Sequence, residues 1–267
     1  KLKMNSIKNF QGTTIILLSS LSFISIFCFN GVGLEADSIH HYLIAKYSLI
    51  HPELLLDHWG KPIYTILSMP FAQFGFKGTQ IFNWICQSFI FFFLWKSADK
   101  LNLKHPYLAP IFYFLFPITI TTGYFGFTEP LCALFLIIAF HYLLNHKYII
   151  SSILISLTPF IRSEGLIFIG LFALFFLYKR DLKAFLLLSF GHILFMLIGL
   201  VFNGENLFWV FNKIPYASLS SHYGSGKLFH FGEKLIYLLG IPSLILFSLG
   251  IIGILLTKDR YRKEYSL

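Results

Sequence analysis

Charged residues are scarce in this chain of 267 residues, where Asp, Glu, Lys and Arg together make up only 12%. Soluble domains carry about 25% charged residues, so this chain has too few charges to cover its surface in water. Hydrophobic residues account for 56% of the sequence, and the mean hydropathy is +0.71. The shortage of charge therefore argues against a soluble domain and indicates an integral membrane protein.

Cysteine is also rare. The three cysteines, Cys28, Cys86 and Cys132, lie in apolar runs without a C-x-x-C partner, so a disulfide framework or a cysteine-based zinc site has no support. The formal net charge of +9 does not require a nucleic-acid partner, because Lys and Arg collect in the cytoplasmic loops of membrane proteins. We therefore expect membrane lipid, and no nucleic acid, around this chain.

Long apolar runs recur along the whole chain. A transmembrane helix needs about 20 mostly apolar residues, and on this basis we predict a single all-α domain over residues 1–267 with about eight membrane-spanning helices. The predicted spans cover residues 13–30, 79–95, 107–124, 130–144, 148–161, 166–178, 184–202 and 235–256. Residues 62–76 are apolar but short and contain Pro70, which favours an interfacial or re-entrant helix.

Basic residues predict the orientation of these spans. Lys1, Lys3 and Lys8 precede the first span, which places the N-terminus in the cytoplasm and the segments 31–78 and 203–234 in outer loops. A cleaved signal peptide within residues 1–36 is the alternative, but its apolar run is long and many spans follow. We expect an uncleaved multi-pass protein of a bacterial plasma membrane. The sequence does not begin with Met and stops after a basic cluster, so we also expect a fragment of a longer protein.

The first outer loop holds most of the polar side chains in the first half of the chain. Its segment 31–61 contains four of the 12 acidic residues and four of the 10 histidines. Residues 38–50 have apolar side chains at helical spacing, which predicts a short helix at the membrane interface. Adjacent residues of a helix point in different directions, so His40 and His41 are interpreted as surface residues and not as paired metal ligands.

The predicted topology brings the other ionisable residues to the same outer side. Arg162 and Glu164 lie between two short spans, because a single continuous helix would place both at mid-bilayer at high cost. The outer set consists of Glu35, Asp37, Asp57, His58, Lys61, Glu129, Arg162 and Glu164. Such a cluster at the membrane edge predicts a functional site. Structural roles stay open, because Glu129 or Glu164 could neutralise Arg162 and Lys61 could snorkel to the interface.

Carboxylates and cations together suit transfer of a group away from a lipid-linked phosphate. A carboxylate such as Asp37 or Glu35 can take a proton from an attacking hydroxyl, or can hold a metal ion. Arg162 can bind a phosphate through two parallel hydrogen bonds. Asp57 and His58 can also serve only to cap or orient the loop.

Four short motifs occur in a recognisable order. They are E-x-D at residues 35–37, H-W-G-K-P at 58–62, T-E-P at 128–130 and R-x-E-G at 162–165. Through them the chain resembles the membrane glycosyltransferases of the C superfamily, which use polyprenyl-phosphate sugars and include protein mannosyltransferases and aminoarabinose transferases. The resemblance covers most of residues 10–180. Ser163 stands where members of this superfamily often have Pro.

This resemblance implies a hexosyltransferase that moves a sugar from polyprenyl phosphate to a glycan, lipid or protein acceptor on the outer face, with inversion. Asp37 would be the general base, with Glu35 assisting it or positioning a divalent metal such as Mg²⁺ or Mn²⁺. The expected substrate-binding residues are His58, Trp59, Lys61, Arg162, Asp57, Glu129 and Glu164. Among them, His58, Lys61 and Arg162 would stabilise the departing phosphate, and Trp59 would stack on the sugar or the isoprenoid.

Two other functions could use the same polar cluster. A transporter or lipid flippase predicts inverted repeats with broken helices in matching halves, whereas this sequence shows one pair of short segments and one E-x-D loop. A non-catalytic membrane subunit predicts that replacement of Asp37 leaves every product unchanged.

Overall fold

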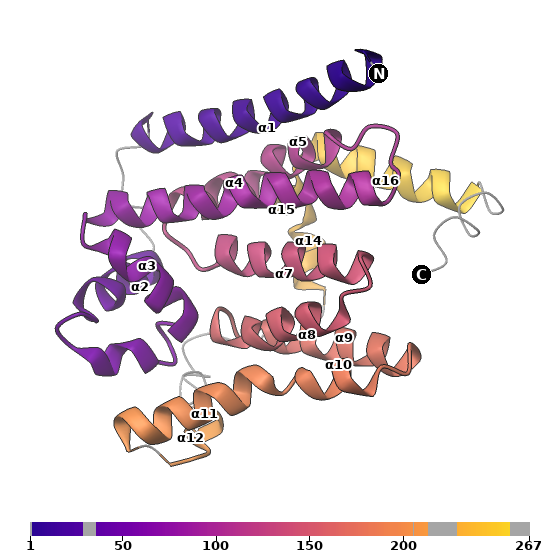
Figure 1. The fold of residues 1–267 in the computed structure, drawn as a ribbon. Helices are drawn as coiled ribbons and strands as arrows, with labels where there is room; N and C mark the ends of the chain where they lie inside the picture. Colours follow the sequence, from indigo (N-terminus) through magenta and orange to yellow (C-terminus); the bar gives the residue numbers. More distant parts are fainter. Residues whose placement is uncertain (1, 29–35, 205, 213–228, 257–267) are drawn as a thin grey trace.

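A computed structural model describes residues 2–28, 36–204, 206–212 and 229–256. Glu35 and residues 213–228 of the predicted second outer loop lie outside these ranges. Within them the regular structure is entirely helical and contains no β-strand, so the predicted all-α class is confirmed. Figure 1 shows the longer helices lying side by side, with the first outer loop folded at one end of them.

Most of the described helices are shorter than a membrane span, and three of them end just before Pro117, Gly204 and Gly240. In chain order the described helices are α1 (Leu2–Cys28), α2 (Ala36–Tyr47), η1 (Pro52–Leu56), α3 (Pro62–Ala72), α4 (Phe76–Lys100), α5 (Leu108–Leu115), α6 (Pro117–Tyr124), α7 (Glu129–Leu144), α8 (Tyr148–Leu157), η2 (Thr158–Phe160), α9 (Gly165–Tyr178), α10 (Leu182–Leu187), α11 (Phe190–Asn203), α12 (Trp209–Asn212), α14 (His230–Glu233), α15 (Leu235–Leu239) and α16 (Ile241–Leu256). α4 packs against α1 and α7, and α7 packs against α8.

Several predicted spans are interrupted. Phe116 has an extended backbone before Pro117, as residues before proline prefer, and this separates α5 from α6. Gly240 adopts φ +73° and separates α15 from α16. In the part of the chain that the structure describes, only Leu182–Phe202 is long and apolar enough to cross a membrane by itself, and α6 with α7 would add a second span across a 118° bend. The number of eight spans therefore stays a prediction.

The first outer loop forms three short helices that pack on one another. Asp37 in the first turn of α2 and Lys46 in its last turn both complement the helix dipole. α3 begins at Pro62, a residue that suits the first turn of a helix, and it packs between α2 and α4. Both predicted helices of this loop are present. The side chain of Tyr64 in α3 is fully buried, as part of the main hydrophobic core.

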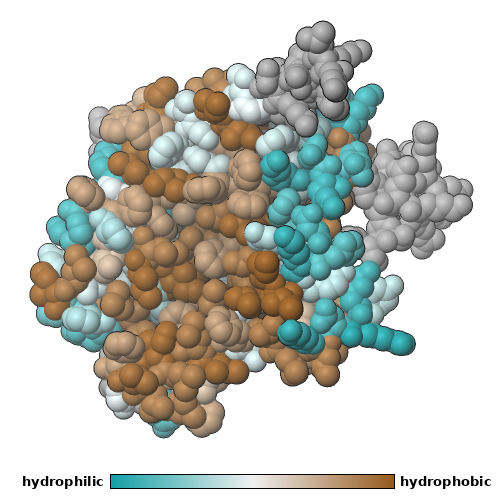
Figure 2. All heavy atoms as spheres, viewed as in Figure 1, coloured by the Kyte–Doolittle hydropathy of each residue, from teal (hydrophilic) through white to brown (hydrophobic). Residues whose placement is uncertain are grey.

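The two ends of the bundle carry different connections. Figure 1 shows the loops that follow α4, α7 and α9 at the right-hand end, and these loops contain Lys104, Lys147 and Arg180. The first outer loop lies at the left-hand end, where α7 and α9 begin. Figure 2 shows the same face mostly covered by hydrophobic residues, with hydrophilic residues gathered along the right-hand edge. The basic loops and the candidate site thus lie at opposite ends.

Candidate active site

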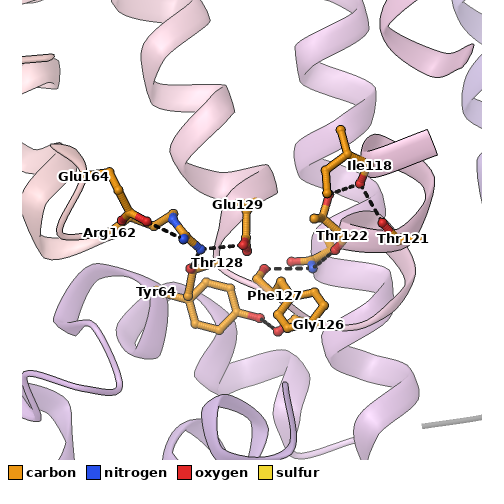
Figure 3. Close-up of polar contacts among 11 residues, drawn as sticks. Tyr64, Ile118, Thr121, Thr122, Gly126, Phe127, Thr128, Glu129, Arg162 and Glu164 are labelled. Carbon is orange, nitrogen blue, oxygen red and sulfur yellow. Dashed lines mark hydrogen bonds and ion pairs between the residues drawn. The ribbon is translucent and has the colours of Figure 1, made fainter. Parts of the chain in front are cut away.

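Arg162 lies in the turn between η2 and α9 and binds two carboxylates. Its Nη1 atom is 2.5 Å from Oε1 of Glu129, and its Nη2 atom is 2.7 Å from Oε1 of Glu164. Nη1 also donates a hydrogen bond of 3.2 Å to Oγ1 of Thr128. Figure 3 shows the guanidinium between the two glutamates. The T-E-P and R-x-E-G motifs therefore meet in space, and both carboxylates that could neutralise Arg162 do so.

Lys61 points into the protein towards the same turn. Its side chain is buried, and Nζ donates a hydrogen bond of 2.8 Å to Oγ of Ser163. Burial lowers the pKa of the Lys61 ammonium to about 8; Arg162 also lowers it, while Glu164 raises it. Because the side chain does not reach the surface, the alternative that Lys61 merely snorkels is wrong.

Asp57 stabilises the tight turn that precedes Lys61 and orients its side chain. Its Oδ1 atom accepts a hydrogen bond of 2.5 Å from the Gly60 backbone N–H, and the Gly60 carbonyl accepts another from Thr65. A Cβ atom at Gly60 would lie 2.8 Å from Cγ2 of Ile44, so α2 can approach closely here. Lys61 itself adopts φ +65°, which is uncommon for a residue with a side chain. Asp57 thus has the loop-orienting role that the sequence left open.

His58 faces a different part of the molecule from Lys61. Its Nε2 atom lies 3.1 Å from the carbonyl oxygen of Val210, and its ring packs edge-on against Trp209. His58 lines a cavity of about 140 Å³, which is also lined by Phe160, Ser163 and other residues of η2, α11 and α12. The structure therefore separates His58 from the predicted phosphate-binding pair Lys61 and Arg162, although Ser163 lines both places.

Two adjoining cavities form a polar cleft above the core. The smaller, of about 140 Å³, is lined by Asp37, His41, Trp59, Lys61, Thr128, Arg162, Ser163 and Glu164. The larger, of about 360 Å³, is lined by Asp37, His41, Ile118, Thr121, Thr122, Phe125, Phe127, Thr128, Glu129 and Arg162. Four residues line both: Asp37, His41, Thr128 and Arg162. We call the combined space the polar cleft, and its lining includes the exposed carboxylate of Asp37 together with the cations Lys61 and Arg162.

His41 is the site residue that the sequence interpretation missed. It was expected at the surface, but it is only 8% exposed. Its ring stacks on Trp59 with centroids 4.9 Å apart, and Tyr64 packs edge-on at 5.5 Å. The buried residues of α2 are Ser38, His41 and Ala45, which follow helical spacing. These residues are small or polar, so a search for an apolar stripe does not find this buried face.

The structure does not identify a metal site. Among the residues that it describes, no three His, Cys, Asp or Glu side chains are placed to share a metal ion. Glu35, the carboxylate proposed to position one, lies outside the described residues.

Gly165, the last residue of the R-x-E-G motif, permits a close approach of two backbones. A Cβ atom at this position would lie 2.4 Å from the carbonyl carbon of Thr158 and 2.5 Å from the nitrogen of Pro159. We expect Gly165→Ala to lower the free energy of unfolding by about 1–3 kcal/mol, because overpacking displaces α9 from η2. Thermal unfolding in detergent measures this effect. The matched control is Gly170→Ala in the same helix, where a Cβ atom meets no described atom within 4 Å; equal melting temperatures for the two variants would contradict the prediction.

Comparison with known proteins gives one family. The model of glycosyltransferase family 87 matches residues 61–262, which is about three quarters of the chain. The match begins at Lys61 and includes the T-E-P and R-x-E-G motifs, whereas Asp37 and His41 precede it. No curated protein and no solved structure matches the sequence. Family 87 consists of membrane glycosyltransferases of the C type. The match extends over most of the chain, and the chain therefore belongs to glycosyltransferase family 87.

Proposed function

We propose that the chain transfers a hexose from a polyprenyl-phosphate donor to a hydroxyl group of a glycan, lipid or protein, with inversion at the anomeric carbon. The observation that carries this proposal is that Asp37 and the cations Lys61 and Arg162 line one cleft. Membrane glycosyltransfer follows from the family. The donor, the stereochemistry and the residue roles are our proposal.

The cations would receive the phosphate of the donor. Lys61 supplies an ammonium group, and Arg162 has five N–H donors, of which Glu129, Glu164 and Thr128 occupy only some. The two glutamates hold the guanidinium in place, so its charge is oriented before the donor arrives. Preorganised cations of this kind stabilise negative charge that develops on a leaving group. The departing group would be polyprenyl phosphate.

Asp37 would act on the acceptor from the opposite side. Its carboxylate takes the proton of the acceptor hydroxyl while the hydroxyl oxygen forms a bond to the anomeric carbon. The bond between that carbon and the phosphate oxygen breaks, and its electron pair leaves with the polyprenyl phosphate. Attack opposite to the leaving group inverts the configuration. Asp37 is exposed and lines both parts of the polar cleft, so it can meet an acceptor that enters from solvent or from the membrane surface.

The proposal is tested with membranes from cells that express the complete open reading frame. These membranes are supplied with farnesyl-phosphoryl-mannose or farnesyl-phosphoryl-glucose labelled in the sugar, and label is measured in lipid, glycan and protein fractions. We expect transfer from one of these donors and none from the corresponding nucleotide sugar. Parallel reactions with EDTA, Mg²⁺ or Mn²⁺ measure the metal requirement. Transfer from the nucleotide sugar alone would overturn the proposed donor class.

The pKa of Lys61 predicts how phosphate binding depends on pH. Lys61 is cationic below its pKa of about 8 and neutral above it, so the affinity for farnesyl phosphate should fall as pH rises from 7 to 9. Loss of the protonated fraction over this range predicts a decrease of about tenfold. Burial lowers the pKa of His41 to about 4, so His41 stays neutral throughout.

Binding of farnesyl phosphate to the purified chain is measured at several pH values. The Lys61→Met variant is the control, and we expect it to bind weakly with little dependence on pH. A wild-type affinity that does not change between pH 7 and 9 would show that Lys61 does not bind the phosphate as an ammonium.

A further inference from the structure

His41 lines both parts of the polar cleft. It lines the smaller cavity together with Lys61 and Arg162, and the larger cavity together with Asp37 and Arg162. In the proposed reaction the phosphate is held at Lys61 and Arg162, and the acceptor is activated at Asp37. The sugar must then lie between these groups, beside His41.

The orientation of the His41 ring is fixed on several sides. Trp59 stacks on it with an interplanar angle of 19°, His40 packs against the same Trp59, and Tyr64 lies edge-on to His41. The Tyr64 hydroxyl is already engaged, because it donates a hydrogen bond of 2.7 Å to the carbonyl of Gly126. These contacts hold the imidazole in place without using its ring nitrogens.

Nδ1 of His41 is buried and has no hydrogen-bond partner in the described part of the chain. In a neutral imidazole one nitrogen donates and the other accepts. In the tautomer that carries its hydrogen on Nε2, the lone pair of Nδ1 is unused.

A buried polar atom without a partner is unusual in a folded protein and calls for an explanation. Burial also keeps the imidazole neutral, since it lowers the pKa of His41 to about 4, and the nearby cations Lys61 and Arg162 lower it further. A neutral ring with a free lone pair accepts hydrogen bonds from hydroxyl groups, and it does not compete with the cations for phosphate.

We infer that Nδ1 of His41 accepts a hydrogen bond from a hydroxyl group of the sugar being transferred, which makes His41 a sugar-binding residue of the cleft. The inference rests on the proposed function. It assigns to α2 the recognition of the sugar as well as the general base. It also gives Trp59 a role as the support of His41, in place of direct stacking on the substrate.

Three substitutions separate this role from packing. His41→Phe keeps an aromatic ring on Trp59 but removes the acceptor. His41→Asn places an amide oxygen near the position of Nδ1, whereas His41→Gln places its polar atoms near Nε2. We expect His41→Asn to retain function that His41→Phe and His41→Gln lose. A role in packing alone predicts the reverse order, with His41→Phe closest to the wild type.

The experiment measures affinities of the purified chain for farnesyl phosphate and for farnesyl-phosphoryl-mannose and farnesyl-phosphoryl-glucose. The ratio of sugar-bearing to sugar-free affinity isolates the contribution of the sugar. We expect this ratio, for the preferred hexose, to fall about tenfold in His41→Phe, with unchanged binding of farnesyl phosphate. Monodeoxy versions of the preferred hexose then locate the hydroxyl: one of them should weaken binding to the wild type and cause no further loss in His41→Phe, as expected of two partners in one contact.

The outcomes distinguish the inference from the function on which it rests. Failure of the wild type to bind farnesyl phosphate overturns the proposed donor. If His41→Phe binds farnesyl phosphate normally and its ratio of sugar-bearing to sugar-free affinity is unchanged, the role of His41 is overturned but the proposed donor is not. The same conclusion follows if the wild type binds neither farnesyl-phosphoryl hexose more tightly than farnesyl phosphate. If His41→Phe raised only the KM for the acceptor, His41 would contact a hydroxyl group of the acceptor. This result would also overturn the proposed contact with the sugar of the donor.

Discussion

Replacement of Asp37 by Asn should reduce sugar transfer by about 10²–10⁴-fold, which is the usual contribution of a general base. Asparagine has nearly the same shape as aspartate but cannot take up the proton of the acceptor hydroxyl. Because Asp37 contributes no positive charge to the predicted phosphate site at Lys61 and Arg162, the affinity for farnesyl phosphate should stay close to that of the wild type. The defect should therefore appear in kcat and not in donor binding.

Glycolipids and glycans from cells with matched protein levels are compared by mass spectrometry. We expect the Asp37→Asn cells to lose one sugar increment, whose mass gives the class of sugar. Glu53→Gln is the matched control, because Glu53 is an exposed acid of the same loop that pairs with His51 outside the polar cleft. A glycan profile unchanged in Asp37→Asn would remove Asp37 as the base and favour a transporter or a non-catalytic subunit.

Replacement of Arg162 by Gln should affect both activity and stability. Loss of the guanidinium removes charge stabilisation of the leaving phosphate, for which a decrease in kcat/KM of about 10²–10³-fold is expected. It also removes the cation that pairs with the half-buried Glu129. A partly buried group without a partner lowers the free energy of unfolding by about 1–3 kcal/mol. The free energy of unfolding should fall by an amount in this range.

A second variant separates these two effects. In Arg162→Gln/Glu129→Gln the unpaired carboxylate is absent, so we expect most of the stability to return while sugar transfer remains low. Thermal unfolding and transfer from the preferred farnesyl-phosphoryl hexose are measured on the same preparations. If the double variant recovered transfer along with stability, Arg162 would be a structural cation and the phosphate would have to be bound elsewhere.

Composition alone was sufficient to predict the fold class, because so few charges leave little choice but helices in a membrane. The order of the four motifs was sufficient to predict the superfamily, which the match to family 87 confirms. Arg162 was placed correctly between two short helices, since a charged pair in mid-span is costly. These predictions depend on short motifs, on the positions of single charged residues, or on the composition of the whole chain.

Other features depend on contacts between distant segments, and the sequence did not reveal them. The extended backbone before Pro117 divides a run of residues that looked continuous. Asp57 and His58 are neighbours in the sequence, yet one holds the turn at Gly60 and the other faces Val210. The burial of His41 results from Trp59 and Tyr64, which approach it only after α3 packs on α2. Hydrophobic periodicity contains no information about these contacts.

The position of Arg162 between Glu129 and Glu164 has a consequence for how the protein can vary. A change at any of the three alters the charge that the other two experience, so the effects of their substitutions should not add. A library that replaces them one at a time will overstate the importance of each. We expect homologous chains to keep the two glutamates and the arginine together or to replace all three. Successful redesigns of the cleft should likewise change the three positions at the same time.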